Sequence, residues 1–461
     1  MRVAVIGAGV GGLACAVELA GAGVDVVVLE ANAVPGGKVG RRSVGRFTWD
    51  SGPSLLTMPW VFREALGEDC PELEAVEPVT RYAFADGSSF DMSADRERAR
   101  AALEEWSPGA GDDWLRYLAV VDEMWRAAAP LLSGPPPWPP ERGAPAGDPR
   151  ALLAVKPWHT LRSLARATLR DPRLRLVAER SATYAGADPR RTPAALALAG
   201  YVEHAFGAWR PRGGMYTLVE ALAARLERLG GELRLGVAVE KVVVSNRRAR
   251  AVLAGGERIA VDAVVGAVDT LAFARLLGRV PVAQRGERSL SGLAVMLGLS
   301  DAPGDRAHHS VTFPGDYDAE FDDVFVARRP VRDPTLYVST PAATAGGPEA
   351  WFVLVNAPSG TRGVDWEHEA DRVVARLGVA DRVEARTLRT PEDLEAESGA
   401  VGGAIYGRAP HGRLGTLNRP GNRVRGLGNV WATGGTVHPG GGLPLVVLGG
   451  RRVARQLASG S

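Results

Sequence analysis

Three glycines and one acidic residue near the start of the chain have the types and spacing that bind a dinucleotide. Gly7, Gly9 and Gly12 follow a short β-rich run, residues 13–22 favour a helix, and Glu30 ends a second β-rich run. Gly7 permits a tight turn, Gly9 lets the backbone approach a pyrophosphate, and Gly12 allows the helix to pack closely on the strand. The pyrophosphate then meets the helix N-terminus, and Glu30 is placed to accept hydrogen bonds from ribose hydroxyls.

A second glycine pair follows the acidic residue within one loop. Residues 35–38 read Pro-Gly-Gly-Lys, and residues 47–54 read Phe-Thr-Trp-Asp-Ser-Gly-Pro-Ser. This order resembles the extended signature of FAD proteins of the amine-oxidase and carotenoid-desaturase superfamily, in which the loop passes over the phosphates and sugar of the cofactor. Lys38 stands where these proteins usually have arginine, which weakens a bidentate contact and keeps the positive charge.

Two later segments have the pattern of the same cofactor domain. Residues 211–215 contain a glycine pair that opens an amphipathic helix over residues 216–229. Strands are expected at residues 231–235, 237–244, 260–267 and 428–435, the last of them entering a glycine-rich loop at 436–444 before a final helix.

The chain is therefore expected to form two domains of the α/β class. One is a discontinuous, Rossmann-like FAD-binding domain, and the other is an α+β substrate domain with strands at residues 293–299 and 351–355. The expected ranges are 1–90, 205–275 and 400–461 for the FAD-binding domain, and 91–204 and 276–399 for the substrate and membrane-facing domain.

The composition excludes several classes of partner and site. The 461 residues carry 55 Lys and Arg against 53 Asp and Glu, a net charge of +2 that gives no support for nucleic acid as the main partner. Cys15 and Cys70 are the only cysteines, which excludes a disulfide framework or a Cys-based zinc site and indicates a reduced, cytoplasmic protein. Cys15 lies in an apolar run and is expected to be a buried structural thiol. No signal peptide and no transmembrane segment are expected.

Residues 151–170 predict a contact with a membrane surface. Their apolar side chains alternate with Lys156, Arg162, Arg166 and Arg170, which suits a helix that rests on anionic lipid. The alternative is an ordinary amphipathic helix packed on the core. With the first interpretation, the protein is cytoplasmic and held peripherally at the inner face of the cell membrane.

Taken together, these segments resemble the bacterial phytoene desaturase-like carotenoid desaturases over the whole chain. The motifs that carry the resemblance are the N-terminal fingerprint, residues 36–37 and 50–54, Glu203, Gly207, Trp209, residues 211–214, residues 404–407 and the loop 435–444. In that family the last loop lies beside the flavin. Residues 54–62 and 354–358 are more similar to the hydroxycarotenoid 3,4-desaturases than to the phytoene desaturases.

The resemblance implies FAD as cofactor and a lipophilic carotenoid as substrate. The implied reaction removes two hydrogens from a C–C bond at the end of an acyclic C40 carotenoid that carries a 1-hydroxyl, with hydride transfer to the flavin. A long apolar tunnel would position the bond and exclude water. The FAD-binding residues it implies are Gly7, Gly9, Gly12, Glu30, Gly37, Lys38, Ser54, Val239, Gly435 and Leu443.

Two residues are candidates for catalysis. His438, in the loop expected beside the flavin, could hydrogen-bond the isoalloxazine or the substrate end, or could instead fix its own loop. Glu203, with His204, could face the substrate cavity, where a buried carboxyl without a partner favours its neutral form and suits proton handling. His308 and His309 are expected to point to opposite faces of a strand, and no set of metal ligands accompanies them, so no metal is expected.

Four other functions stay open at this point. A phytoene desaturase would introduce several double bonds into a colourless substrate. A carotenoid cis–trans isomerase would use reduced flavin without net oxidation. An FAD amine oxidase would need an aromatic cage for the amine, and a carotenoid-binding protein without activity would leave the FAD signature unexplained.

Overall fold

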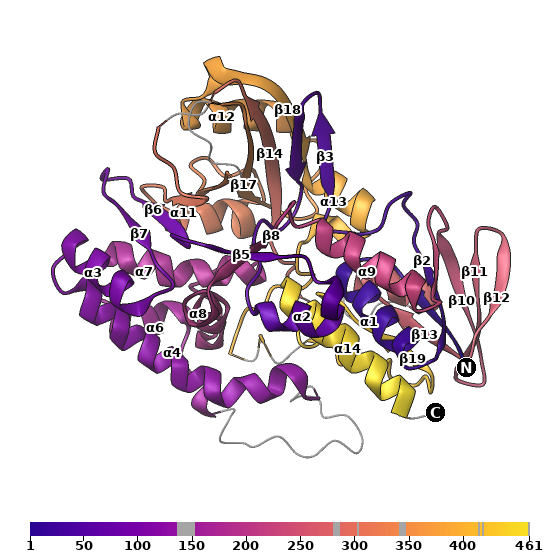
Figure 1. Ribbon diagram of the computed structural model, residues 1–461. Helices are drawn as coiled ribbons and strands as arrows, with labels where there is room; N and C mark the ends of the chain where they lie inside the picture. The colour runs from indigo at the N-terminus through magenta and orange to yellow at the C-terminus, as the bar shows by residue number, and fades with distance from the viewer. Residues whose placement is uncertain are drawn as a thin grey trace.

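A five-stranded parallel sheet brings together strands from the beginning, middle and end of the chain (Figure 1). The computed structural model describes residues 1–135, 153–279, 286–301, 304–340, 347–413, 415–416 and 419–459. The strand order is β19-β13-β1-β2-β9, with bounds β1 (Arg2–Ile6), β2 (Asp25–Leu29), β9 (Glu232–Arg234), β13 (Ala263–Gly266) and β19 (Val430–Ala432). The central strand β1 is almost entirely buried, as parallel strands covered on both faces are. The strands expected around the N-terminal fingerprint are confirmed.

Helices α1 (Val10–Gly21), α9 (Thr217–Arg228) and α14 (Leu443–Ser459) pack together on one face of this sheet (Figure 1). The contact between α1 and α14 depends on glycine, because a Cβ at Gly450 would stand 2.4 Å from the carbonyl oxygen of Gly11. Glu18 of α1 also pairs with Arg451 and Arg455 of α14, at 2.9 and 2.7 Å. Cys15 is fully buried in α1, as expected.

The other face of the sheet is covered by a smaller antiparallel sheet and a short helix. These elements are β10 (Val239–Ser245), β11 (Arg248–Ala254), β12 (Glu257–Ala260) and α10 (Thr270–Leu276). A separate apolar core joins them to β1, β2, β13 and β19.

A seven-stranded sheet forms the second layer of strands, in the order β18-β14-β17-β16-β15-β6-β7. The bounds are β6 (Thr80–Ala83), β7 (Ser89–Met92), β14 (Ser291–Leu299), β15 (His309–Thr312), β16 (Leu336–Ser339), β17 (Glu349–Ala357) and β18 (Val383–Arg389). The two strands expected in the substrate domain are β14 and β17, which pair antiparallel along their whole length. Helix α12 (Trp366–Leu377) packs on this sheet, with α13 (Pro391–Ser398) nearby (Figure 1). Since β6 and β7 pair here, residues 80–92 lie in this sheet, and the exact division into domains stays a prediction.

A group of helices lies below the seven-stranded sheet in Figure 1. It contains α3 (Arg96–Trp106), α4 (Ala110–Ser133), α6 (Leu161–Thr168), α7 (Pro172–Glu179) and α8 (Ala197–Phe206), with the 3-10 turns η2 (Arg180–Ala185) and η3 (Ala194–Leu196). These elements share an apolar core with side chains of β6, β7 and α11 (Tyr317–Phe321).

The expectation of one amphipathic helix over residues 151–170 is wrong. Residues 151–152 lie outside the described residues, residues 153–154 are helical, and the chain then turns before a separate helix, α6, which covers only Leu161–Thr168. Pro157 is the physical reason, because a residue that precedes proline is disfavoured in the α conformation, and Lys156 has φ of 51°. Thr160 then caps α6 by accepting a hydrogen bond from the Ser163 amide at 3.1 Å.

Short strands and helical turns complete the fold. They are β3 (Arg41–Val44), β4 (Phe47–Asp50), β5 (Leu73–Val76), β8 (Ala208–Pro211), α2 (Pro59–Leu66), and the turns η1 (Gly67–Asp69), η5 (Asp322–Ala327), η6 (Ala380–Arg382) and η7 (Val401–Gly403). None of the helices in the described ranges is long and apolar enough to cross a membrane.

Candidate functional site

A cavity of about 1040 Å³ extends from the glycine loops of the parallel sheet to the helices α4 and α8. Its first part is lined by the loops after β1, β2 and β19, and its middle part by residues 51–58 and by Ile405 and Tyr406. Its far part is lined by apolar side chains of α4 and α8 on one side and by β14, β16 and β17 on the other. One continuous space therefore connects the expected cofactor site with the substrate region.

The three fingerprint glycines have three different surroundings. Gly7 has φ of 102°, which favours glycine, and a Cβ at Gly12 would stand 2.2 Å from the Gly7 carbonyl oxygen and 2.9 Å from the Ala267 Cβ. A Cβ at Gly9 would meet nothing within 4 Å, because Gly9 faces the cavity at the N-cap of α1. Gly7 and Gly12 thus shape the turn and the helix packing, whereas Gly9 leaves free space for a ligand.

Glu30, the acidic residue after β2, accepts hydrogen bonds that hold the glycine loop. One carboxylate oxygen of Glu30 accepts the Ala8 amide at 2.8 Å, and the other accepts the Asn32 amide and side chain at 2.9 and 2.8 Å. Glu30 also lines the cavity. Its carboxylate is therefore oriented before any ribose is bound.

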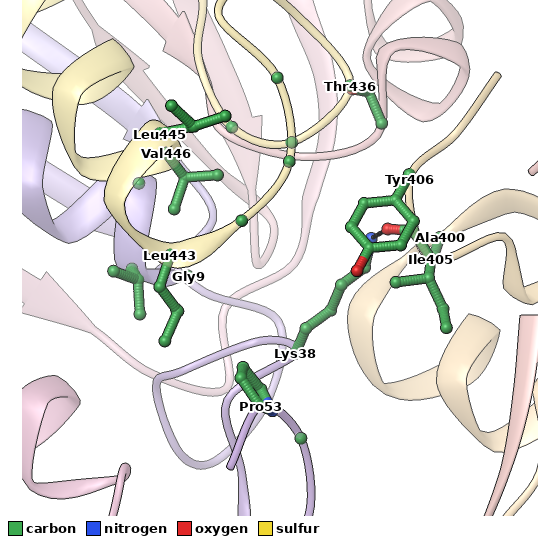
Figure 2. Close-up of a pocket in the computed structure, with 18 of the residues that line it drawn as sticks. Gly9, Lys38, Pro53, Ala400, Ile405, Tyr406, Thr436, Leu443, Leu445 and Val446 are labelled. Carbon is green, nitrogen blue, oxygen red and sulfur yellow. Dashed lines mark hydrogen bonds between the residues drawn. The ribbon is translucent and has the colours of Figure 1, made fainter. Parts of the chain in front are cut away.

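The second glycine pair packs directly on the first loop, and Lys38 leaves it towards the middle of the cavity. Gly36 donates to the Ala8 carbonyl at 2.9 Å, and a Cβ at Gly37 would lie 3.5 Å from the Cα of Gly9. Figure 2 shows the Lys38 side chain extended towards Ile405 and Tyr406, and its ammonium donates to the Ile405 carbonyl. Burial lowers the pKa of Lys38 to about 8, although Asp269 acts in the opposite direction.

The loop after β19 forms the opposite wall of the cavity. Gly435, His438 and Leu443 all line it, and Leu443 begins α14. Arg419 lines the cavity too and donates to the Gly435 carbonyl at 2.8 Å. Burial lowers the pKa of Arg419 to about 10, so that two buried cations, Lys38 and Arg419, lie around the middle of the cavity.

The imidazole of His438 is held by the end of helix α4. Its Nε2 lies 3.1 Å from the Gly134 carbonyl oxygen, and the side chain is 8% exposed. Burial, together with the repulsion of Arg452, lowers the pKa of His438 to about 4. The ring is therefore neutral at physiological pH, and its contact fits a residue that fixes its loop against α4.

Val239 and Ser54, two further residues expected at the FAD, also line the cavity. Val239 is the first residue of β10. The Ser54 hydroxyl pairs with the hydroxyl of Tyr337 on β16, so Ser54 connects the cofactor side of the cavity to the seven-stranded sheet.

The residues Glu203 and His204 on α8 face different environments. Glu203 lines the main cavity and is 6% exposed. Burial raises its pKa, and the attraction of Arg180 and a hydrogen bond with Tyr184 offset this rise only in part. The ring of His204 instead makes an edge-on contact with Trp114, with ring centroids 5.1 Å apart. Glu203 is thus the member of the pair that can contact a substrate.

A group of polar residues that the sequence does not predict lies beside Glu203. Arg180 and Tyr184 on η2, Tyr317 on α11 and Tyr337 on β16 all line the cavity, and Arg180 donates to the hydroxyl of Tyr184. The Arg180 guanidinium lies over the rings of Tyr184 and Tyr337, 4.8 and 5.5 Å from their centroids. No local motif marks these residues, because they come from distant segments of the chain.

The expected arrangement of His308 and His309 on opposite faces is wrong. The two rings lie together, with centroids 4.3 Å apart and Nδ1 atoms 3.2 Å apart, because strand β15 begins only at His309 and the strand alternation does not extend to His308. No group of three or more His, Cys, Asp or Glu side chains in the described part of the chain could hold a metal ion.

Comparison with known proteins agrees with this architecture. Residues 10–288 match the family of flavin-containing amine oxidoreductases. The chain is 34% identical to a hydroxyneurosporene desaturase of Rubrivivax gelatinosus, over 99% of this chain and 93% of that one. It is 32% identical both to a 4,4'-diapolycopene oxygenase of a Methylomonas species and to a zeta-carotene-forming phytoene desaturase of Myxococcus xanthus, again over 99% of this chain and over 98% and 93% of theirs.

Solved structures of amine oxidases share the fold at much lower sequence identity. Cyclohexylamine oxidase of Brevibacterium oxydans superimposes with a TM-score of 0.66 at 16% identity, over 100% of this chain and 99% of that one. The expected fold class, an α/β FAD-binding architecture of the amine-oxidase type, is confirmed.

The residues around the glycine loops fit an FAD. The open space above Gly9 is where a pyrophosphate can approach the backbone, and the free amides at the start of α1 favour its negative charge. Glu30 is oriented for ribose hydroxyls, and the cavity continues past Lys38 and Gly435, where a flavin ring would be enclosed.

Proposed function

Because the chain belongs to the family of flavin-containing amine oxidoreductases and is similar to carotenoid desaturases over nearly its full length, we propose that it desaturates the 3,4 bond of a 1-hydroxylated acyclic C40 carotenoid. It is an FAD-dependent oxidoreductase that acts on CH–CH groups. The 3,4 position and the hydroxyl are the finer part of the proposal.

The shape and chemistry of the far part of the cavity carry this proposal. Beyond Ser54 the cavity continues between α4 and α8, along Trp125, Ala128, Leu131, Leu132, Leu198 and Val202. Such a wall removes a long hydrocarbon from water. A linear polyene whose end lies beside the cofactor fits this arrangement.

FAD, when bound, supplies a hydride acceptor for a carbon next to the polyene. The protein has to hold that carbon in place and to exclude water from it, which the apolar walls and the loop around Gly435 can do. The neighbouring carbon must also lose a proton, and we assign its acceptance to Glu203. Burial raises the pKa of this carboxyl, which makes its carboxylate a better proton acceptor. His438, neutral and bonded to Gly134, is proposed to position the loop.

A second candidate function within the same family is phytoene desaturation. The similarity to a phytoene desaturase of Myxococcus xanthus, at 32% identity, favours it nearly as much as the similarity to the hydroxyneurosporene desaturase favours the first. The polar residues around Glu203 argue for an oxygenated substrate, since a hydrocarbon end leaves the buried Tyr317 hydroxyl without a partner.

We also propose peripheral association with the inner face of the cell membrane. Leu153 and Trp158 are each 56% exposed, and they precede α6 in a segment that contains Lys156. Exposed apolar side chains next to a cation fit an anionic lipid surface, from which the lipophilic substrate would also be drawn.

The test is a parallel incubation of the FAD-loaded protein in liposomes with phytoene and with a 1-hydroxylated acyclic carotenoid. We expect a product two mass units lighter, absorbing at longer wavelength, from the hydroxylated substrate only. Coloured products from phytoene would identify the second candidate function. No change of mass would instead support an isomerase, and hydrogen peroxide formed from an amine would support an amine oxidase. The share of protein that floats with the liposomes measures the membrane association.

A further inference from the structure

Charged and polar side chains lie together in the part of the cavity that a hydrocarbon would be expected to fill. Arg180 and Glu203 are only 8% and 6% exposed, and both line the cavity between the apolar wall of α8 and the seven-stranded sheet. Burying charged groups is costly, and a purely apolar substrate would cover them without offering any hydrogen bond. A polar part of the substrate is the ligand that this arrangement fits.

The hydrogen-bonding capacity of the group points to a neutral oxygen. Tyr184 accepts from Arg180 and bonds to Glu203, which leaves acceptor sites on the carboxylate and further N–H groups on the guanidinium. Tyr317 lines the same cavity, and its buried hydroxyl has no hydrogen-bond partner among the described residues. An alcohol both donates and accepts, so it can meet Glu203 and a donor together, whereas Glu203 would repel a carboxylate.

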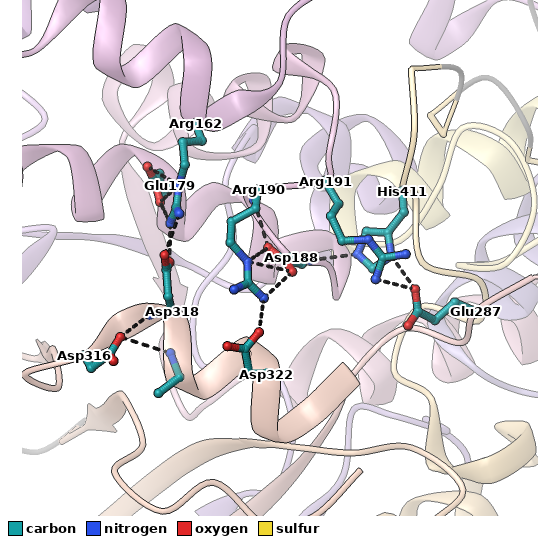
Figure 3. Close-up of polar contacts among 11 residues, drawn as sticks. Arg162, Glu179, Asp188, Arg190, Arg191, Glu287, Asp316, Asp318, Asp322 and His411 are labelled. Carbon is teal, nitrogen blue, oxygen red and sulfur yellow. Dashed lines mark hydrogen bonds and ion pairs between the residues drawn. The ribbon is translucent and has the colours of Figure 1, made fainter. Parts of the chain in front are cut away.

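The protein fixes this group rigidly from both ends of η2. Glu179 just before η2 accepts from Arg162, which also binds Asp318 at 2.8 Å (Figure 3). Asp188 just after η2 pairs with Arg190 at 2.8 Å, and its backbone amide donates to His411 at 2.9 Å (Figure 3). These contacts tie the segment that carries Arg180 and Tyr184 to α11 and to the loop at His411, so the polar group is preorganised.

The polar group also lies next to the expected position of the flavin. Tyr337 pairs with Ser54, which follows the second glycine pair, and a Cβ at Gly186, directly after η2, would lie 2.9 Å from the ring of Tyr406. Tyr406 is the residue towards which Lys38 extends (Figure 2). A substrate end held here would have its last carbons close to the reacting position.

We propose that Arg180, Glu203 and Tyr317 form the subsite that binds the terminal hydroxyl of the substrate and so determines which bond meets the flavin. This inference rests on the proposed desaturase function, and it adds the residues that select an oxygenated chain end over a hydrocarbon end.

The test compares two acyclic carotenoids of equal conjugated length, one with and one without a 1-hydroxyl. Tyr317→Phe is the first variant, because removing a hydroxyl without a partner is expected to leave the fold intact. Tyr184→Phe is the second, and Tyr117→Phe is the matched control, since Tyr117 is buried in the helical core outside the main cavity. All are measured as FAD-loaded proteins, by kcat/KM and by equilibrium binding to the dithionite-reduced enzyme, which cannot accept a hydride.

We expect Tyr317→Phe to lose about 10- to 100-fold in affinity and in kcat/KM for the hydroxylated carotenoid. Tyr184→Phe, which removes the hydroxyl that positions Arg180 and Glu203, should lose affinity for the same carotenoid. Affinity for the carotenoid without hydroxyl should change less than about threefold, and Tyr117→Phe should behave as the unmodified protein. Equal losses for both carotenoids would overturn the subsite while leaving desaturation intact. An unmodified enzyme that removes hydrogen only from the carotenoid without hydroxyl would overturn both the subsite and the proposed function.

Discussion

Substitution of Gly9 separates cofactor binding from folding. A Cβ at Gly9 meets nothing within 4 Å, and its φ of −69° is open to any residue. Gly9→Val should therefore leave the unfolding free energy of the apoprotein unchanged, or raise it by about 0.4–1 kcal/mol because the unfolded chain is less flexible. The valine side chain instead occupies the cavity above the start of α1, where the pyrophosphate would approach.

The loss of affinity follows from the contacts that the valine blocks. One hydrogen bond from a backbone amide to a charged phosphate contributes about 1.5–3 kcal/mol, which corresponds to ~10- to 150-fold in Kd. Steric displacement of the pyrophosphate adds to this loss. We expect Gly9→Val to be isolated colourless and to bind added FAD at least about 100-fold more weakly, measured by quenching of flavin fluorescence.

Gly12→Ala is the matched control, because it should have the opposite pattern. Its Cβ would stand 2.2 Å from the Gly7 carbonyl oxygen, so the backbone must shift, and an overpacked contact of this kind costs about 1–3 kcal/mol. Urea unfolding of the apoproteins should therefore show a lower midpoint for Gly12→Ala and not for Gly9→Val. A yellow Gly9→Val protein with its full complement of FAD would refute the assigned role of this loop.

Two further predictions concern buried groups that titrate. Burial lowers the pKa of Lys38 to about 8 in the unliganded protein. If the ammonium of Lys38 supports the anionic cofactor, FAD binding takes up a proton above pH 8. The affinity for FAD then falls as the pH rises, by at most tenfold per pH unit. Lys38→Met should bind FAD more weakly at pH 7 and lose the pH dependence of affinity, whereas Lys38→Arg keeps the charge. The measurement is a fluorescence titration with FAD from pH 7 to 9.5. Equal pH dependence for Lys38→Met and the unmodified protein would contradict the role of the ammonium. His438, whose pKa burial lowers from 6.5 to about 4, binds fewer protons folded than unfolded, so its contribution destabilises the protein as the pH falls through that range. His438→Gln should reduce the loss of stability between pH 7 and pH 5 in urea unfolding, and an unchanged loss would argue against a buried neutral ring.

The parts of the fold that the sequence predicts are those built from neighbouring residues. Strand, glycine turn, helix and second strand follow each other within the first 30 residues, so local steric requirements at Gly7 and Gly12 determine them. The motif at residues 50–54 is a short run of sequence with a long-range reason, because the Asp50 carboxylate accepts the Met215 and Tyr216 amides and holds the glycine turn before α9. Each of these motifs makes contacts that its own residue types require.

The incorrect predictions depend on contacts that periodicity does not contain. The helix expected over residues 151–170 fails at Pro157, and Arg162, assigned to a lipid surface, binds Glu179 and Asp318 instead. Alternation in a strand placed His308 and His309 apart, but β15 begins between them. In both cases the position at which the helix or strand begins determined the direction of the side chains, and this boundary was not predicted.

The two ends of the cavity are formed by different kinds of sequence: glycine loops at the cofactor end and single polar residues at the substrate end. The cofactor end consists of contiguous glycine loops, in which most substitutions would damage the turn or the packing. The polar subsite consists of single residues from η2, α8 and α11, which are distant segments of the chain without a common motif. A change such as Tyr317→Phe can therefore alter the accepted chain end while the FAD-binding loops stay unchanged. We therefore expect relatives of nearly equal similarity, which carry the names of a hydroxyneurosporene desaturase, an oxygenase and a phytoene desaturase, to differ at such positions on one scaffold.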